Sequence, residues 1–582
     1  MRGQSCSWAA LCPSARMLTR PGLLVTWRRA NGRADSRVTG PRPLPILPLV
    51  ALLVVCVAFP PEVHGLALAA MAILALLAVV ASPAMTSPAS YGVWAAVPVV
   101  LVASRLGIAP GEAVEPAATM LLAALAGIAA SGIAIPVDLL AKLFGAAVAV
   151  VSSRALYEWM WGLSSWAERV RAEMPAADSA AILNRLEQGR PYGGFVTPAA
   201  LGCFLAMTVP AVAAWALGKR GSARAFGLSV AALGAAALLT TRSVTALAAL
   251  AGAVMLAGLR GRIPRRVLVG TALTIGLAAT AIGIARPDAV LAPGSQDSPW
   301  SLRAGNVRVA LEIARAHPLF GVGPGGYAEA FPQYRRAGDN ESRHAHDLPA
   351  ELMAEWGIPA GLLLSALFFW LFVAPVVRAS GSFRSFPFGL SIGLAAFALH
   401  NVVDFTSFLP SLLVLAAVTR GWLAARPIAP PAAPRWLVAT LVLTGGLAVV
   451  VAGAGFAREA VFDARRSAAT GDHIRALADA SRARRAAPWD ADPPQLEAEA
   501  RMAAGGDLAA ALAAADRAVA RAPARAAARA VRARARAAAG DAAGAYADLV
   551  EASRLYPTSP DYAPGRDALE DALAKARAGA PR

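Results

Sequence analysis

Long apolar segments alternate with short polar connections over most of the chain, from Leu44 to Ala457. Runs of about 17 to 25 apolar residues are long enough to cross a bilayer as helices. The pattern predicts an all-α polytopic membrane protein with about 12–13 transmembrane helices. The predicted segments are 44–59, 64–81, 91–104, 117–135, 137–153, 197–217, 226–240, 244–259, 267–285, 357–377, 386–402, 407–424 and 436–457.

Two longer polar intervals interrupt this pattern. The first, 154–197, is rich in tryptophan and tyrosine, and we expect these rings to form an interfacial belt; sugar stacking is the alternative. The second, about 286–356, holds three of the six histidines. Long loops between regular elements are usually functional. We therefore expect the active site in the second loop.

Composition and charge agree with a membrane protein. Hydrophobic residues make up 57% of the chain and charged residues 16%, whereas a soluble domain carries about 25% charge. Basic residues gather in 1–43 and in short connections, which predicts a cytoplasmic N-terminal tail and places the loop at 286–356 outside, in the periplasm if the chain comes from a Gram-negative bacterium. The net charge of +18 does not indicate nucleic-acid binding, because no basic groove motif accompanies it.

The region after the last apolar segment, 458–582, changes to an alanine- and arginine-rich helical composition. Gly471–Asp472, Gly506–Asp507 and Gly540–Asp541 recur at spacings of 35 and 34 residues, each followed by a proline at a similar offset. This period resembles the tetratricopeptide repeat, a unit that stacks into protein-binding surfaces. We expect periplasmic repeats with a protein partner; the alternative is an alanine-rich tail without repeats.

The second loop begins with Arg303 and Arg308, and its pattern predicts a helix over 307–316. A glycine-rich turn follows at 321–326, and glycines allow the backbone to approach other groups closely. The turn lacks the lysine and the preceding strand of a nucleotide-binding loop. Phosphate binding by this turn alone is therefore not predicted.

A histidine-rich segment closes the loop. His344 and His346 are followed by Asp347 and Glu355, and a histidine beside carboxylates can act as a general base near neutral pH. The two rings of a His-x-His pair do not face one ion in either a helix or a strand. We expect no metal and no cofactor. The alternative is that both histidines are solvated loop residues.

Polar residues also occur near the ends of apolar segments. Arg242 lies at the turn of a predicted helical hairpin, and His400 and Asp404 lie near the outer end of a later segment. Charges at such depth need a partner or a water-filled cavity, and arginine suits phosphate oxygens. Interfacial snorkelling of Arg242 and helix packing by the other pair are the alternatives.

These motifs together resemble the O-antigen ligase and polymerase superfamily, bacterial membrane glycosyltransferases, over roughly Gly189 to Leu423. The resemblance rests on Arg303, Pro318 to Gly323 with Tyr327, His344 to His346, Glu355 to Gly357, the earlier Thr240 to Arg242, and His400 with Asp404. Two positions depart from the family pattern. Asp347 stands where an amide or hydroxyl residue is usual, which we expect to raise the pKa of the neighbouring histidine, and Ala360 replaces a glycine.

The resemblance implies transfer of a glycan from an undecaprenyl-pyrophosphate donor to an acceptor hydroxyl, with inversion and without a metal. His346 would be the base, with His344 as the alternative. The implied pyrophosphate-binding residues are Arg242, Arg303 and Arg308. The implied supporting residues are Asp347, Glu355, His400 and Asp404.

The resemblance also implies a setting for this reaction. The chain would lie in the bacterial inner membrane, and the acceptor would be the lipid A core, a growing polysaccharide or a protein. Two other classes remain open. A glycolipid transporter would place its charges near the bilayer midplane, and a non-catalytic scaffold would use the membrane part only to display the terminal repeats.

Overall fold

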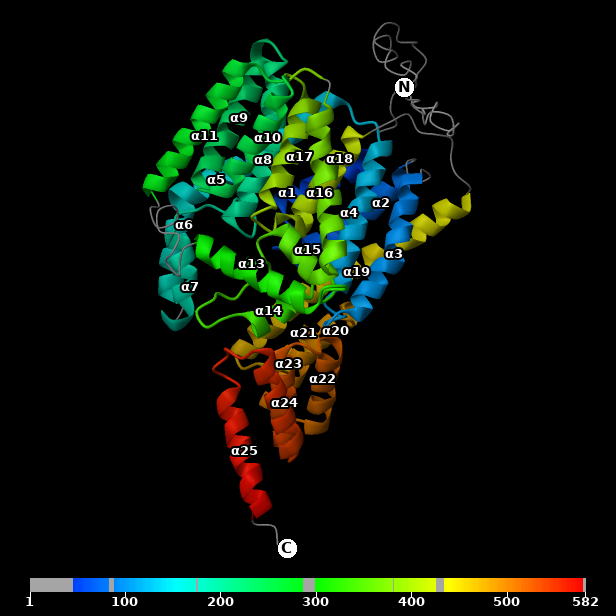
Figure 1. Ribbon diagram of the computed structural model, residues 1–582, viewed down its shortest axis with the longest axis vertical. Helices are drawn as coiled ribbons and strands as arrows, with labels where there is room; N and C mark the ends of the chain where they lie inside the picture. Colours follow the sequence, from blue (N-terminus) through cyan, green and yellow to red (C-terminus); the bar gives the residue numbers. More distant parts are fainter. Residues whose placement is uncertain are drawn as a thin grey trace, which may run out of the picture. The chain divides into compact units, whose positions relative to one another are not determined.

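The computed structural model describes residues 46–82, 88–173, 176–285, 299–379, 381–424 and 434–578. The predicted cytoplasmic tail at 1–43 lies outside this part of the chain, as does the start of the second loop. Every regular element in the described part is a helix (Figure 1). The prediction of an all-α polytopic membrane protein is confirmed.

Each predicted apolar segment coincides with one helix. These helices are α1 (Ile46–Ala58), α2 (Gly65–Ala81), α3 (Pro88–Leu106), α4 (Val114–Gly132), α5 (Val137–Tyr157), α8 (Pro198–Leu217), α9 (Gly221–Thr240), α10 (Val244–Leu259), α11 (Arg265–Ala285), α16 (Ile358–Arg378), α17 (Phe386–His400), α18 (Pro410–Leu423) and α19 (Pro434–Ala469).

Not all of these helices are equally suited to crossing a bilayer. Among the described residues, 6 helices are long and apolar enough, namely α4, α5, α8, α9, α16 and α19. Shorter apolar helices of 10–17 residues are α1, α2, the second half of α3, α10, α17 and α18. The count of 12–13 spans therefore stays a prediction.

Small residues let the central helices approach closely. A Cβ on Gly393 in α17 would overlap the carbonyl oxygen of Met207 in α8, and one on Gly421 in α18 would overlap that of Gly127 in α4. Membrane helices associate through such small-residue contacts because lipid supplies little hydrophobic driving force. The close packing forms a rigid base for the loops at the helix ends.

Connections that the charge pattern predicts on one side of the membrane lie at the same end of the bundle. Lys219, after α8, contacts Asp138 at the start of α5, with 2.7 Å between Nζ and Oδ1. At the other end Glu62, between α1 and α2, accepts a 2.6 Å hydrogen bond from the hydroxyl of Ser411 at the start of α18. The second end also carries both polar intervals.

The two polar intervals form helices of their own. The first contains η3 (Glu158–Gly162), α6 (Leu163–Glu173) and α7 (Ala176–Glu187), and the second contains α13 (Pro299–Ala316), α14 (Tyr327–Tyr334) and α15 (Leu348–Trp356). α13 begins earlier than the predicted helix over 307–316. In the first interval the rings of Tyr157, Trp159 and Trp161 are exposed, as an interfacial belt requires.

The terminal region consists of α20 (His473–Ala486), α21 (Asp492–Ala503), α22 (Leu508–Arg521), α23 (Ala526–Ala538), α24 (Ala542–Leu555) and α25 (Ala563–Ala578). Side chains of Asp472, Asp507 and Asp541 cap α20, α22 and α24. Gly471 and Gly540 have positive φ, at +79° and +85°, and in the middle repeat the glycine with positive φ is Gly505, at +63°. The assignment as tetratricopeptide repeats stays a prediction.

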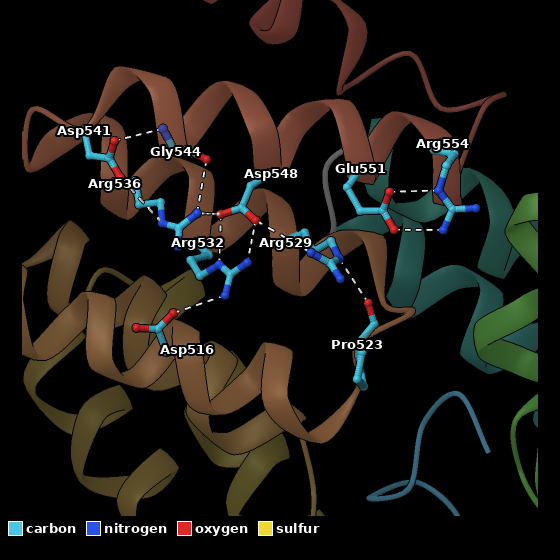
Figure 2. Close-up of polar contacts among 10 residues, drawn as sticks. All are labelled: Asp516, Pro523, Arg529, Arg532, Arg536, Asp541, Gly544, Asp548, Glu551 and Arg554. Carbon is cyan, nitrogen blue, oxygen red and sulfur yellow. Dashed lines mark hydrogen bonds and ion pairs between the residues drawn. The ribbon is translucent and has the colours of Figure 1, made fainter. Parts of the chain in front are cut away.

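Buried acids surrounded by arginines hold these helices together. The side chain of Asp548 in α24 is 3% exposed and contacts Arg532 and Arg536 from α23, at 2.6 Å and 2.9 Å. Figure 2 shows Arg529 on the same carboxylate and the separate, more exposed pair of Glu551 and Arg554. A single carboxylate thus links several turns of two neighbouring helices.

α19 connects the apolar helices to the terminal region without a break. It is continuous from Pro434 to Ala469, so the position 457/458, where the composition changes, falls inside a helix. Near that position Glu459 accepts a 2.8 Å hydrogen bond from the amide of Gly65, the first residue of α2. The outer part of α19 is therefore fixed to the membrane helices before α20 begins.

Candidate active site

One face of α13 forms the wall of a cavity. Its residues at spacings of three and four, as on one side of a helix, line a space of about 500 Å³. The other walls come from the histidine-rich segment and from the connection between α17 and α18. The lining residues are Trp300, Arg303, Ala304, Val307, Arg308, Leu311, Arg315, His346, Asp347, Val402 and Val403.

The glycine-rich turn packs against α15, the helix that follows the histidine-rich segment. The amides of Val322 and Gly323 donate to the carbonyls of Ala354 and Glu355 in α15, both at 2.9 Å. Gly321 has φ +66°, and a Cβ there would overlap the Glu355 backbone. The turn is a packing element that requires glycine, which agrees with the absence of a nucleotide-binding pattern.

Glu355 is buried behind this turn, with 4% of its surface exposed. Its carboxyl group accepts from the amide of Tyr327 at 3.4 Å. Burial raises the pKa of Glu355 well above its usual range, and the nearby Glu351 adds to the increase. The structure therefore places Glu355 as a support of the loop, not in the cavity wall.

His344 is held by a carboxylate and two rings. Its Nδ1 lies 2.8 Å from Oε1 of Glu351, whose other oxygen accepts from the amide of Ala345 at 2.8 Å. The imidazole stacks on Phe405 at 4.6 Å and on Phe408 at 5.2 Å between ring centroids. A carboxylate on one ring nitrogen selects a tautomer and an orientation for the other.

His346 lies in the cavity wall in a conformation that is uncommon for a residue with a side chain. Its φ is +55°, which is rare outside glycine and asparagine. Its Nδ1 is buried and has no hydrogen-bond partner among the described residues. A buried polar atom without a partner is rare in proteins, and together with the positive φ it marks His346 as a strained residue in the cavity wall.

The charge state of His346 differs from the sequence-based expectation. Burial lowers its pKa to about 4; Asp404 opposes the decrease, whereas Arg303 and His344 add to it. The expectation that Asp347 raises this pKa is wrong, because Asp347 is not among the charges that act on His346. Asp347 instead caps α15, accepting from the amide of Ala350 at 2.8 Å, and burial raises the pKa of Asp347 itself.

Two predicted residues from distant parts of the chain meet behind the cavity wall. Nη2 of Arg303 lies 3.4 Å from Oδ2 of Asp404, which is 1% exposed. The same oxygen lies 4.0 Å from Nε2 of His400, and that nitrogen is 3.2 Å from the hydroxyl of Thr245 in α10. Asp404 therefore links α13 to the ends of α17 and α10 and holds Arg303 in the cavity wall.

The other arginines differ in their surroundings. Arg308 is engaged by Glu312 at 2.9 Å and Asp339 at 2.5 Å, so its charge is largely neutralised. Arg315, which sequence reasoning missed, also lines the cavity, and no ion pair of this residue is found in the described part of the chain. Its seven-residue spacing from Arg308 on a predicted helix was the signal that could have found it.

Arg242 lies apart from these cavity-lining arginines. It occupies the turn between α9 and α10, as predicted, with φ +50°. Its Nη1 donates to the carbonyl of Gln188 in the first polar interval at 3.3 Å. The structure does not bring Arg242 into the cavity lining. Among the described residues, no group of three or more His, Cys, Asp or Glu side chains could hold a metal ion.

Residues 227–365 match the O-antigen ligase family. The matched stretch runs from α9 into α16 and includes Arg242, Arg303, His344, His346 and Glu355. It covers less than half of the chain and excludes the terminal helices. No curated protein matches the chain. The match supports the predicted resemblance and points to an O-antigen ligase-like membrane enzyme of polysaccharide assembly.

Proposed function

We propose that this protein transfers a glycan from an undecaprenyl-pyrophosphate donor to an acceptor hydroxyl in the cavity along α13. The observation that carries the proposal is that His346 lines the same cavity as Arg303 and Arg315. A base and cations in one cavity suit an attack by a hydroxyl on a carbon that carries a phosphate leaving group. The match to the O-antigen ligase family supports the same reaction class.

In this mechanism the neutral imidazole of His346 accepts the proton of the acceptor hydroxyl. The hydroxyl oxygen bonds to the anomeric carbon from the face opposite the pyrophosphate, the carbon–oxygen bond to pyrophosphate breaks, and the configuration inverts. The pyrophosphate leaves with the bonding electrons. Arg303 and Arg315 stabilise this developing charge. A preorganised group shielded from water contributes about 3–4 kcal/mol to a transition state, and Arg315 contributes less because its side chain is exposed.

Arg242 belongs to the proposal as a donor-binding residue outside the cavity. It lies at the turn of the α9–α10 hairpin, next to Gln188 of the first polar interval, and a lipid-linked pyrophosphate would approach the protein at this end of the helices. His344, held by Glu351, is the alternative base. The proposed location is the inner membrane, with the cavity and the terminal helices in the periplasm and a protein partner on the terminal helices.

The test is complementation of a strain that lacks this protein with His346→Ala. We expect one glycan class to disappear at normal protein abundance, scored by blots of lipopolysaccharide, free polysaccharide and glycoprotein. The class that disappears identifies the acceptor. His317→Ala is the matched control, since His317 ends α13 in the same loop but does not line the cavity.

Unchanged glycans with both His346→Ala and Arg303→Ala would overturn the catalytic proposal. A non-catalytic scaffold predicts that pattern together with loss of function on deletion of residues 463–582. A glycolipid transporter predicts that donor accumulates on the cytoplasmic face, whereas a transferase defect leaves donor on the outer face. Labelling the donor from each side of the membrane separates these two outcomes.

A further inference from the structure

The turn between α22 and α23 contacts the loop that carries the cavity. The side chain of Arg525 in this turn is 13% exposed and contacts three carboxylates from three elements. Its Nη2 lies 2.9 Å from Glu112, between α3 and α4, and 2.7 Å from Glu329 in α14. Its Nη1 lies 2.6 Å from Asp492 at the start of α21. One guanidinium therefore joins the terminal helices to α14.

The guanidinium of Arg525 stabilises the charged form of the carboxylates around it. Burial raises the pKa of Glu112 to about 7 even though Arg525 opposes the increase; Asp490, Glu329 and Asp492 add to it. Several carboxylates in a buried space repel one another unless a cation lies among them. Loss of Arg525 would leave these carboxyl groups repelling one another or protonated, and it would remove the contacts that join the three elements.

Backbone contacts continue this interface. The amide of Gly111 donates to the carbonyl of Arg521 at 3.2 Å, and a Cβ at Gly111 would overlap the carbonyl of Trp489. Next to these groups Ala109, Ala491 and Ala522 are buried against one another. These close contacts indicate that the α3–α4 connection and the terminal helices have complementary surfaces.

A second contact leads from the terminal helices to the cavity wall. Arg335, after α14, donates to the hydroxyl of Tyr556 at 2.7 Å and to the carbonyl of Asp339 at 2.5 Å. The side chain of Asp339 in turn holds Arg308 of the cavity. The path from Tyr556 to the cavity therefore consists of consecutive polar contacts.

α14 also packs against the segment that carries His344 and His346. Tyr327 and Phe331 of α14 share one buried cluster with Ala345, the residue between His344 and His346. Interiors of this kind are close-packed, so a shift of one member displaces the others. The position of α14 therefore sets the position of the histidine segment.

We propose that the terminal helices clamp this chain's own α14, and that Arg525 and Tyr556 are positioning residues for the cavity at His346. The sequence predicted a separate protein partner for these helices. The clamp gives one surface of them a partner within the chain. The inference goes beyond the proposed function, and the clamp itself can be tested without any transfer assay.

The experiment compares Arg525→Met with Arg534→Met in the full-length protein in nanodiscs. Arg534 is a matched control because it lies in α23 and is 63% exposed, and among the described residues it pairs with Glu499, at 3.4 Å. Backbone hydrogen exchange of residues 327–341 reports on the clamp. We expect Arg525→Met to speed this exchange by about tenfold or more, as for loss of a buried ion pair, and Arg534→Met to leave it within about twofold.

Arg525→Lys should restore slow exchange in part, because it returns a cation. Exchange in α8 and α17 serves as the folding control. Unchanged exchange of residues 327–341 in Arg525→Met would overturn the clamp. If that variant misfolds, Tyr556→Phe decides the question, since it removes only the hydroxyl that contacts Arg335 and Glu341 and should speed exchange near Arg335.

Transfer is then measured in the same variants. The positioning role predicts a lower turnover with donor binding little changed in Arg525→Met, and normal turnover in Arg534→Met. Fast exchange with normal turnover would overturn the positioning role. If His346→Ala leaves transfer unchanged, the proposed function fails, whereas the exchange experiment still decides whether the clamp exists.

Discussion

Nδ1 of His344 lies 2.8 Å from Oε1 of Glu351, and the second oxygen of Glu351 accepts the amide of the next residue, Ala345. Glu351 is almost fully buried, with 1% of its surface exposed. One carboxylate therefore holds both the ring and the backbone of the segment that leads to His346. The carboxylate is important even if His344 never touches the substrate.

We expect Glu351→Gln to lower transfer by about 10- to 100-fold, as for other residues that orient a functional histidine. The amide offers one acceptor oxygen in place of two, so it cannot accept from both the imidazole of His344 and the amide of Ala345, and the ring is less well oriented. Glu168→Gln is the control, because Glu168 lies in α6, outside the loop that carries the cavity, and its side chain is exposed. Equal rates in the two variants would show that the His344 contact does not support the reaction.

The pH dependence of the transfer rate should show that His346 stays neutral over a wide pH range. The pKa of His346 is lowered from 6.5 to about 4 by burial. A lowered folded-state pKa means that the stabilising contribution of neutral His346 is present above pH 6.5 and is lost as the pH falls toward 4. Transfer by membranes should therefore stay nearly constant from pH 8 to about pH 5 and fall below it. A half-maximal rate near pH 6.5 would contradict this assignment.

Substitution of Gly321 and Gly189 by alanine distinguishes the cost of backbone strain from the cost of steric overlap. Both have positive φ, at +66° and +62°, but only Gly321 has other atoms where a Cβ would lie. Gly189→Ala should cost about 1 kcal/mol. Gly321→Ala should cost more, because the Glu355 backbone must move, and it should also lower transfer. Thermal unfolding in detergent measures both, and equal shifts would contradict the close packing of the turn.

Asp548, which Figure 2 shows among three arginines, should be sensitive to loss of its charge. Asp548→Asn leaves Arg529, Arg532 and Arg536 around a neutral group, which should destabilise the terminal helices by about 3–5 kcal/mol. Glu551→Gln removes only a more exposed pair and should cost less than about 1 kcal/mol. Protease cleavage within α23 and α24 measures the difference. Similar cleavage of both variants would argue against a structural role for Asp548.

The sequence predicted what local composition determines. The apolar segments became helices because their length and composition suffice for that, and the motif order placed His346 and Arg303 in one loop. Contacts such as that between Arg303 and Asp404, 101 positions apart, depend on how helices pack and could not be read from one sequence. The charge state of His346 was missed for the same reason, because burial decides it.

The boundary inside α19 shows a different limit. The change from apolar to charged residues at 457/458 predicts a domain border, and α19 runs through that position because Arg458 to Ala469 contains neither proline nor glycine. The surface contacted by Arg525 was also missed, since repeats indicate a binding surface without naming its occupant.

Because α19 is unbroken, its length fixes the direction in which the terminal helices face relative to α2. Each residue in an α-helix advances about 100° and 1.5 Å, so one residue inserted between Glu459, which is held at α2, and Ala469 would turn α20 and all later helices by about 100° and carry Arg525 away from Glu329. Four inserted residues would bring them back to within about 40° of the original direction. The same four residues would also displace the later helices by about 6 Å along the axis, so relatives that retain the clamp should keep the length of this segment.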